Sequence, residues 1–283
     1  MKSVVVTGVS SGIGRGTAKV LVEKGFHVFG SVRKAEDAKR LSDELGNAFT
    51  PLLFDITDER AVHEAAQQVR DSLHGETLFG LVNNAGVSAQ GPLAYLPVDQ
   101  YRHQLEVNLV GPFIATQAFV PLLGMDRSLK GNPGRIINIS SVGGKLGGPF
   151  IGAYHASKFG LEGFSDSLRR ELLLYGIDVI VIGPGSVATA TWDKAEEIDV
   201  SRYEETEYAP ALEKYTRFMI DGGRKGYSPE RLGKKIWKAL TVPHPRVRYA
   251  VVPHSFITWT IPLLLPKRLV DTLIANSLGL QRK

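Results

Sequence analysis

Residues 3–16 read SVVVTGVSSGIGRG, an apolar run that leads directly into a glycine-rich turn. The valines favour a β-strand, and apolar residues at helical spacing follow the turn. Glycine allows tight or left-handed backbone, and the free N–H groups and dipole at the start of a helix attract phosphate. The stretch therefore predicts a strand, a phosphate-binding turn and a helix, the alternative being a plain glycine turn capped by serine.

This strand and helix begin an alternation that continues to about residue 183. Further β-rich runs occupy residues 27–32, 49–55, 79–86, 134–140 and 177–185, and amphipathic segments occupy 12–24, 35–45, 58–74, 97–123 and 154–175. Several β-rich runs are apolar at consecutive positions, which suits strands covered on both faces. We expect a three-layer α/β/α architecture with a doubly wound parallel sheet and right-handed crossovers, in which residues 1–283 form one domain.

Residues 188–227 interrupt this alternation, and a helix is expected to follow from about Ser228. A connection of this length in a compact domain is usually functional, so we interpret it as a partly helical lid over a binding site. Its aromatic and apolar residues include Trp192, Tyr203, Tyr208, Tyr215, Phe218 and Met219.

Residues 253–283 form a C-terminal extension beyond the alternating pattern. Four of its apolar residues share one face of a predicted helix: Leu269, Val270, Leu273 and Ile274. The extension could close the binding pocket, pack on a second subunit or rest on a membrane surface. Peripheral membrane contact is the least favoured of these alternatives.

Composition excludes several classes of function. The 34 basic and 29 acidic residues are interleaved, so the net charge of +5 does not form the basic stripe typical of nucleic-acid binding. The chain has no cysteine, and its histidines never stand three or four residues apart, so no metal site is expected. No signal peptide or transmembrane helix is predicted, and we expect a cytoplasmic protein.

The end of the second predicted strand indicates which dinucleotide the glycine turn would hold. An acidic residue there commonly binds the adenosine ribose diol and would repel the additional phosphate of NADP. The sequence instead has Val32 followed by Arg33, whose guanidinium can pair with a 2′-phosphate, assisted by Ser31 and Arg15. We predict NADP(H) as the preferred cofactor, with NAD(H) as the alternative and a solvated loop charge as the plain interpretation of Arg33.

Five motifs in order give the chain a family resemblance. They are TGVSSGIG from residue 7, NNAG at 83–86, INISS at 137–141, YHASK at 154–158 and PGSVAT at 184–189. Together they resemble the short-chain dehydrogenase/reductase family from residue 3 to about 190. The resemblance implies a Rossmann fold and an oxidoreductase that interconverts a carbonyl and an alcohol by hydride transfer. The glycine spacing is similar to that of the YxxxK branch, which reduces or oxidises carbonyls, rather than that of the sugar epimerases.

The resemblance implies a catalytic set of Asn108, Ser141, Tyr154 and Lys158. Hydride transfer to a ketone creates an alkoxide that needs a proton, and a phenol with a pKa of about 10 is a sluggish base at neutral pH. Lys158 lies one helical turn from Tyr154 and would stabilise the tyrosinate by its charge, which lowers the phenol pKa. Taken alone, the pair is more typical of a solvated helix face, and the other motifs change that interpretation.

The other two members of the set would support this proton transfer. Ser141 lies at the end of a strand and would donate to the forming oxyanion, although Ser140 has the same chemistry and only spacing favours Ser141. Pro112 has no N–H for the carbonyl of Asn108, four residues earlier. We hypothesise that this carbonyl holds a water on the proton path, the alternative being a kink made for packing.

The resemblance also implies the residues that hold the cofactor. Besides Tyr154 and Lys158 they are Gly8, Ser10, Ser11, Gly12, Ile13, Gly14, Arg33, Asp55, Ile56, Asn83, Ala85, Gly86, Pro184, Gly185, Val187 and Thr189. Asp55 is expected to meet the adenine amino group, Asn83 to tie strands together as well, and Thr189 to bond the carboxamide. His155 is expected to be incidental.

The small-molecule substrate is expected to be apolar. Val142, Leu146, Phe150 and Ile151 lie between the serine and the tyrosine, and with the aromatic lid they favour a steroid, retinoid, lipid or aromatic carbonyl. A homo-dimer or homo-tetramer is expected by analogy with the family. The alternative from another class of function is a non-catalytic dinucleotide-binding regulatory or scaffold protein.

Overall fold

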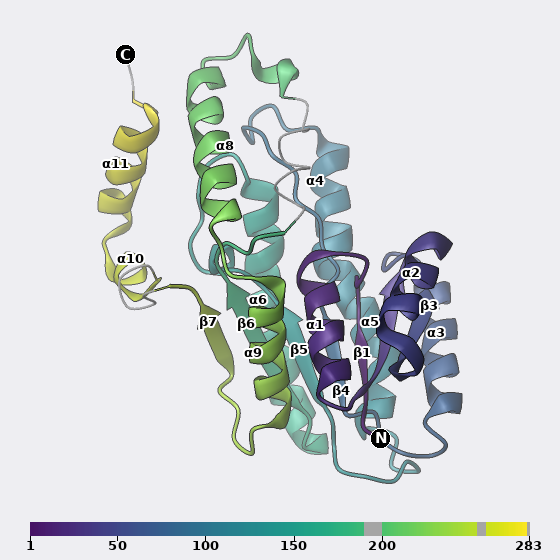
Figure 1. The fold of residues 1–283 in the computed structure, drawn as a ribbon. Coiled ribbons are helices and arrows are strands. Elements are labelled where there is room, and N and C mark those ends of the chain that lie inside the picture. The colour runs from purple at the N-terminus through teal and green to yellow at the C-terminus, as the bar shows by residue number, and fades with distance from the viewer. Residues whose placement is uncertain (190–199, 254–258, 282–283) are drawn as a thin grey trace.

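The computed structural model describes residues 1–189, 200–253 and 259–281 of the chain (Figure 1). In these residues a seven-stranded, wholly parallel sheet has the order β3-β2-β1-β4-β5-β6-β7. The strands are β1 (Ser3–Val6), β2 (His27–Val32), β3 (Phe49–Leu53), β4 (Gly80–Asn83), β5 (Arg135–Ile139), β6 (Asp178–Pro184) and β7 (Arg248–Val251). The chain winds outward from β1 to β3 and then from β4 to β7, which confirms the doubly wound Rossmann fold.

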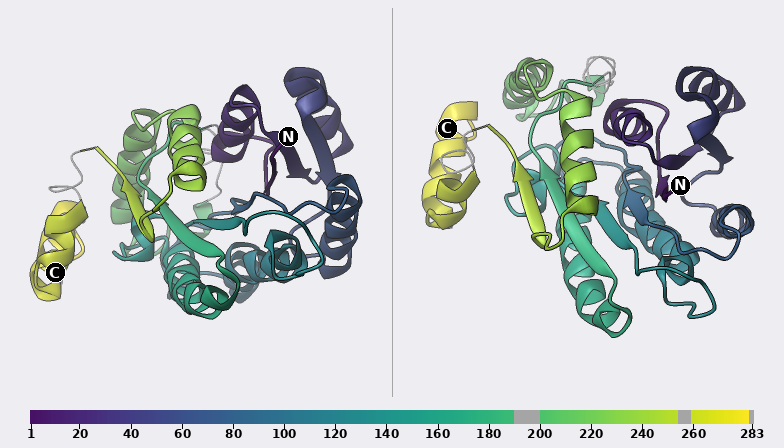
Figure 2. Two further views of the ribbon diagram at one scale, coloured as in Figure 1. Left: turned by 90° about the horizontal axis from the view of Figure 1, so that it is seen from below. Right: turned by 60° about the horizontal axis from the view of Figure 1, so that its bottom comes forward.

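Helices cover both faces of the sheet and complete the three expected layers (Figure 2). One face carries α1 (Gly12–Glu23), α2 (Ala35–Leu45) and α9 (Pro229–Thr241), and the other carries α3 (Glu59–Ser72), α5 (Gly111–Phe119) and α6 (Gly152–Glu171). Alternate residues of β1 divide between the two cores, with Val5 in one and Val4 and Val6 in the other. This two-sided burial explains why the strands are apolar at consecutive positions.

Shorter or peripheral elements complete the described chain. They are α4 (Val98–Leu105), α8 (Ala209–Arg224), α10 (Ile261–Leu264), α11 (Lys267–Leu278), η1 (Gly46–Ala48), η2 (Glu106–Val110), η3 (Val120–Leu123), η4 (Val142–Gly144), η5 (Leu172–Tyr175) and η6 (Ser201–Tyr203). The proposed lid contains η6 and α8, whereas Trp192 lies outside the described residues. The extension contains α10 and α11, which lie on the outer side of β7 (Figure 1).

The long helical segment predicted at 97–123 is present as α4, η2, α5 and η3. The η2 part is a π-helical turn in which the Gly111 N–H donates to the Glu106 carbonyl, and Pro112 follows it. Residues Val98–Leu123 are long and apolar enough to cross a membrane by composition, but 61% of the most apolar window is buried inside the protein. That burial is typical of a helix that packs in a protein core.

Two features of the fold were not predicted. Strand β7 extends the sheet beyond β6, with Ile182 aligned to Tyr249. Helix α6 begins at Gly152, two residues earlier than the expected 154. By contrast, α9 begins as expected after Ser228, whose side chain accepts from the Arg231 N–H at 3.3 Å.

Close packing of α1 on α9 requires glycine at their crossing. A Cβ at Gly233 of α9 would lie 2.7 Å from the Gly16 carbonyl oxygen of α1. We therefore expect Gly233→Ala to lower the free energy of unfolding by about 1–3 kcal/mol, because overpacking forces the two helices apart. Urea unfolding followed by circular dichroism measures this change.

Gly222→Ala in α8 is the matched control, since a Cβ there has no neighbour within 4 Å among the described residues. This control should leave the free energy of unfolding unchanged or raise it by up to about 1 kcal/mol, because alanine favours helix. Equal losses in both variants would contradict the packing argument.

Candidate active site

The glycine-rich turn connects β1 to α1 at the carboxyl edge of the sheet, where ligands of open α/β sheets bind. Gly8 and Gly12 have positive φ angles of 70° and 56°, and a Cβ at Gly14 would collide with the Gly8 carbonyl. Ser11 precedes α1 without capping it through its side chain. The turn thus forms a cradle of backbone atoms, which we call the glycine cradle, and any side chain at these glycines would strain or fill it. A pyrophosphate group would fit there, at the start of the helix.

The NNAG segment fixes this cradle from the neighbouring strand. Asn84 donates through Nδ2 to the carbonyls of Thr7 and Gly8 at 2.9 and 3.0 Å. The Thr7 hydroxyl accepts in turn from the Asn84 and Ala85 N–H groups. Sequence reasoning missed Asn84 and Thr7, although each is adjacent to a glycine-containing motif that it did use.

Asn83 ties strands together as expected. Its Nδ2 donates to Asn138 Oδ1 of β5 at 2.9 Å and to the Thr116 hydroxyl of α5 at 3.2 Å. The side chain is fully buried below the strand ends. Gly86, farther along the same segment, packs against the Asn108 side chain.

Polar groups predicted to contact the adenosine part of the cofactor lie at the ends of β2 and β3. Arg33 Nη1 is 3.6 Å from the Asp55 carboxylate, and both side chains are largely exposed. Burial raises the pKa of Asp55, but hydrogen bonds from Thr57 and the charge of Arg33 outweigh it and leave the pKa below its usual value. The two residues assigned to the 2′-phosphate and the adenine are therefore neighbours.

Three other predicted contacts at this side serve the protein itself. Ser31 is buried and accepts from the Gly8 N–H at 2.9 Å, so its hydroxyl supports the glycine turn. Arg15 forms a bidentate pair with Glu44. The Ile56 side chain is buried against Gly111 of α5. Both arginine side chains are exposed, but Arg15 is held by Glu44 whereas Arg33 makes only the longer contact of 3.6 Å with Asp55, so Arg33 is the better candidate phosphate ligand.

The loop after β6 lies beside the same cradle. Thr189 would contact a Cβ at Gly12 at 3.3 Å, which places the loop against the glycine turn. Val187 is buried, and the backbone of Ala188 donates to the Tyr227 carbonyl at 2.9 Å. Pro184 ends β6, and Gly185 packs tightly against Val252. One site is thus surrounded by the glycine turn, the NNAG segment and this loop.

Ser141, Tyr154 and Lys158 meet at the ends of β5 and β6. Ser141 lies close enough to Tyr154 for its hydroxyl to act on the phenol and oppose the rise in the phenol pKa. Lys158 Nζ lies 5.7 Å from the centre of the Tyr154 ring and donates to the Ile139 carbonyl at 2.8 Å. Ser140 points elsewhere, and its hydroxyl is buried without a protein partner in the described residues. The geometry therefore favours Ser141 over Ser140.

Burial dominates the acid–base properties of this pair. It raises the pKa of Tyr154 above 10.0, against the opposing hydrogen bond with Ser141. It also lowers the pKa of Lys158 to about 8, while the nearby charge of Glu162 raises it. The phenol pKa is thus raised in this structure rather than lowered as the sequence led us to expect, because removal of water from the hydroxyl outweighs the hydrogen bond with Ser141.

Asn108 lies in the π-helical turn and is completely buried. Its amide group accepts from the Val87 N–H at 2.8 Å and donates to the Val87 carbonyl at 2.9 Å and the Ser157 hydroxyl at 3.1 Å. The side chain therefore joins α6 to the segment after NNAG. The water held by its carbonyl stays a hypothesis.

His155 fastens the loop between Ser141 and Tyr154, so the expectation that it is incidental is wrong. The Gly148 N–H donates to Nε2 at 2.8 Å, and Nδ1 lies 2.8 Å from the Gly143 carbonyl, which can only accept. The ring must therefore be neutral with its proton on Nδ1. Burial favours this form, because it lowers the pKa of His155.

Aromatic side chains from the segment predicted to be a lid and from the loop before α6 lie near the catalytic tyrosine. Phe150, Tyr203, Tyr215 and residues of α8 form one buried cluster, and Phe150 and Tyr215 rings meet at 5.6 Å in an edge contact. Tyr215 is close enough to Tyr154 for the two phenols to interact electrostatically, and burial raises the pKa of Tyr215. Phe218 is instead 70% exposed and does not line this site.

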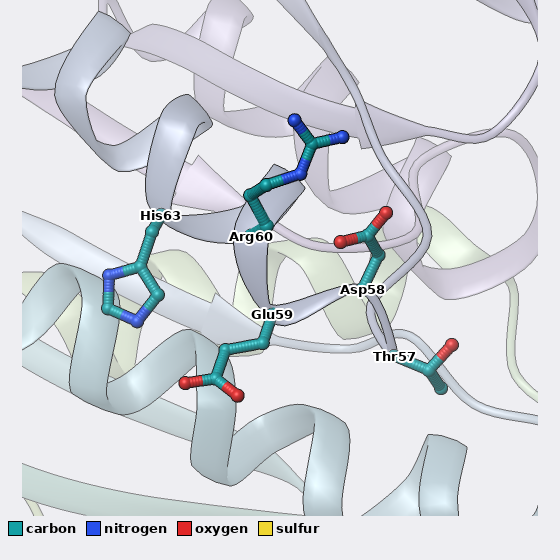
Figure 3. Close-up of a pocket in the computed structure, with 5 residues that line it drawn as sticks. All are labelled: Thr57, Asp58, Glu59, Arg60 and His63. Atoms are coloured by element: carbon teal, nitrogen blue, oxygen red, sulfur yellow. The ribbon is translucent and has the colours of Figure 1, made fainter.

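Two surface hollows lie outside the catalytic residues. One of about 660 Å³ surrounds the start of α3, where Thr57, Asp58, Glu59, Arg60 and His63 fan out in different directions (Figure 3). Asp58 there caps the helix by accepting from the Ala61 N–H. The other, of about 300 Å³, adjoins the glycine turn and is lined by Ser10, Ser11, Gly12, Thr189 and the basic residues Arg15, Lys19 and Arg40.

Comparison with known proteins agrees with this geometry. The model of the short chain dehydrogenase family matches residues 2–199. The chain is 37% identical to the NADPH-dependent 3-dehydrocapnine reductase of Ornithobacterium rhinotracheale over 98% of both proteins. It is 34% identical to retinol dehydrogenase 5 of Homo sapiens over 96% of this chain and 87% of the relative. A short-chain dehydrogenase structure from Streptomyces avermitilis superimposes with a TM-score of 0.75 at 25% identity, covering 97% of this chain and 94% of that one.

The family match covers most of the chain, and the relatives are similar along nearly its whole length. The family's tyrosine and lysine are both present and lie together. These findings do not favour a non-catalytic scaffold. The chain therefore belongs to the short-chain dehydrogenase/reductase family and is an NAD(P)-dependent oxidoreductase that acts on CH–OH groups.

Proposed function

We propose that the protein is an NADP(H)-dependent reductase of an apolar ketone or aldehyde, which it converts to the alcohol. The grouping of Ser141, Tyr154 and Lys158 beside the glycine cradle carries this proposal. The name of the relative at 37% identity, an NADPH-dependent reductase, supports the same cofactor. Assembly into a dimer or tetramer and a cytoplasmic location remain predictions from the resemblance and the composition.

The residues of the site can supply the proton and stabilise the charge that reduction requires. When bound, the nicotinamide supplies the hydride. Ser141 can donate its hydroxyl hydrogen to the carbonyl oxygen as negative charge develops there. Tyr154 then gives its phenolic proton to that oxygen, and the Lys158 ammonium stabilises the tyrosinate left behind. Burial raises the phenol pKa, so Tyr154 holds its proton before the reaction and can act as the general acid.

The surroundings of Tyr154 support an apolar substrate. Phe150, Tyr203 and Tyr215 present aromatic surface from the loop and the lid, and Met219 packs against the same cluster. Such a lining stabilises a hydrophobic ligand while a few polar groups fix its orientation. Turnover of a carbonyl panel of graded size and polarity, followed by NADPH absorbance, tests this class of substrate, and preference for small polar carbonyls would contradict it.

Loss of the phenolic hydroxyl should abolish the chemistry without disturbing the fold. We expect Tyr154→Phe to lower kcat by about 10²–10⁴-fold, since general acid catalysis has that magnitude. NADPH affinity, measured by fluorescence, should change little. Tyr175→Phe is the control, because Tyr175 lies at the far end of the helical segment that carries Tyr154. Full activity of Tyr154→Phe would overturn the assigned role.

Arg33 should set the preference for NADPH. We expect Arg33→Met to raise the Kd of NADPH by about 10–100-fold, the value of a charge-assisted hydrogen bond, while the Kd of NADH stays constant. Arg60→Met is the control, because Arg60 is an exposed arginine at the start of α3 that pairs with Glu64 (Figure 3). Equal weakening of both cofactors would show that Arg33 does not read the 2′-phosphate.

A further inference from the structure

A buried carboxylate with no part in the mechanism above lies one helical turn beyond Lys158. Glu162 is only 5% exposed. Arg248 Nε donates to both of its carboxylate oxygens at 3.0 Å, and Arg248 Nη2 lies 2.9 Å from Oε1. Lys145 Nζ lies 3.5 Å away. A buried charge is costly unless it is paired and hydrogen-bonded, so this arrangement must be maintained by the surrounding fold.

Arg248 connects Glu162 to the backbone of the catalytic serine. Its Nη2 donates to the Ser141 carbonyl at 3.1 Å, across 107 residues of sequence. The guanidinium occupies space that Gly183 of the adjacent strand leaves open, because a Cβ there would collide with it. A planar guanidinium can hold a carboxylate and a carbonyl at once, which a lysine cannot do with the same geometry.

The C-terminal extension contacts this pair. Arg248 Cζ lies 4.4 Å from the centre of the Trp259 ring, a cation–π distance. At its other end the extension packs Leu278 and Leu280 against the aromatic cluster that contains Phe150 and Tyr215. The extension therefore contacts the surroundings of the active site at two places within one chain.

We propose that Arg248 is a positioning residue that couples the C-terminal extension, through Trp259, to the catalytic Ser141 and Lys158. Its guanidinium fixes the Ser141 carbonyl and holds the Glu162 carboxylate near the lysine, and Glu162 maintains the ammonium form of Lys158. The kinetic consequences of this inference rest on the proposed function. It also assigns the extension a role inside the molecule, among the three alternatives that the sequence left open.

The charges around Lys158 determine how each substitution acts. Tyr154 and Glu162 on its own helix act directly on Lys158. Lys145 on the adjacent loop and Arg248 on β7 face Glu162, and Tyr215 on α8 interacts with Tyr154. Lys158 has a pKa of about 8, which Glu162 raises against burial. Removal of the Glu162 charge should therefore lower this pKa, whereas removal of the Arg248 charge should raise it.

Kinetic pH profiles of charge variants test the coupling. In Glu162→Gln, the loss of kcat/KM at alkaline pH should move to lower pH by about one unit, as expected for an opposite charge nearby. In Arg248→Met this alkaline loss of kcat/KM, the alkaline limb of the pH profile, should move to higher pH. The kcat should also fall, because the Ser141 carbonyl loses its hydrogen bond from Arg248. Opposite shifts are not expected from a merely structural role, and unchanged limbs in both variants would overturn the proposal.

Stability measurements provide a readout that needs neither cofactor nor turnover. Because the folded pKa of Lys158, about 8, lies below its ordinary 10.5, the unfolded state binds more protons in that window and the free energy of unfolding rises with pH. In Glu162→Gln this rise should begin at lower pH. If wild-type protein turns over no carbonyl, the proposed function fails, whereas the urea-unfolding comparison still decides whether Glu162 acts on Lys158.

Arg248→Met leaves a buried carboxylate without its partner and could unfold the protein. The double variant Glu162→Gln/Arg248→Met removes both charges and avoids this problem. We expect it to fold, to place the alkaline limb between those of the single variants and to retain the lowered kcat. A return of kcat to the wild-type value would show that the contact with the Ser141 carbonyl has no effect.

A double-mutant cycle tests the contribution of the extension. Trp259→Leu should lower kcat by about 2–30-fold, the range of a cation–π contact, and should add little to Arg248→Lys because both act through one guanidinium. Trp237→Leu is the control, since Trp237 forms a similar pair with Lys24, the residue that follows α1. Wild-type kcat in Trp259→Leu, or fully additive losses, would exclude the coupling.

Discussion

The burial of a lysine ammonium beside a phenol is the constraint on which the rest of this structure depends. An ammonium in a dry site is stable only where hydrogen-bond acceptors and an opposite charge surround it. Lys158 obtains the Ile139 carbonyl because β5 ends there, and it obtains the carboxylate of Glu162 because both face the same side of α6. The end of one strand and the face of one helix therefore decide where the chemistry can occur.

The parallel sheet provides the frame for that placement. All described strands run in one direction, so the cradle after β1, the NNAG segment after β4, Ser141 after β5 and the loop after β6 gather at one edge. Buried polar side chains then satisfy the backbone where the strands end, as Asn84 does for Thr7 and Gly8. Several residues assigned to the cofactor, among them Ser31, thus support the shape of the cradle and need not touch a ligand.

Local patterns predicted the repeating units of the fold but not every element. Strands with consecutive apolar residues, amphipathic helices and glycine turns each depend on residues close together in sequence. The strands up to β6 and the helices between them could therefore be predicted from periodicity. Strand β7 was missed because four residues at a sheet edge, of which only Val251 is buried, carry little pattern of their own. The role of His155 was misjudged for a similar reason, since its two partners belong to a loop whose conformation cannot be predicted from a local sequence pattern.

The sequence by itself determined the doubly wound architecture and the glycine-rich turn, because these depend on local pattern along the chain. It identified the serine, tyrosine and lysine through their resemblance to the family motifs. Only the tertiary structure decided that burial outweighs the hydrogen bond with Ser141 at Tyr154 and that Arg248 reaches Ser141 across 107 residues. Desolvation depends on every atom around a group, and a contact at a sheet edge depends on which strand packs beside which. Neither the desolvation of a group nor such a contact can be predicted from a local sequence pattern, so both became known only from the folded chain.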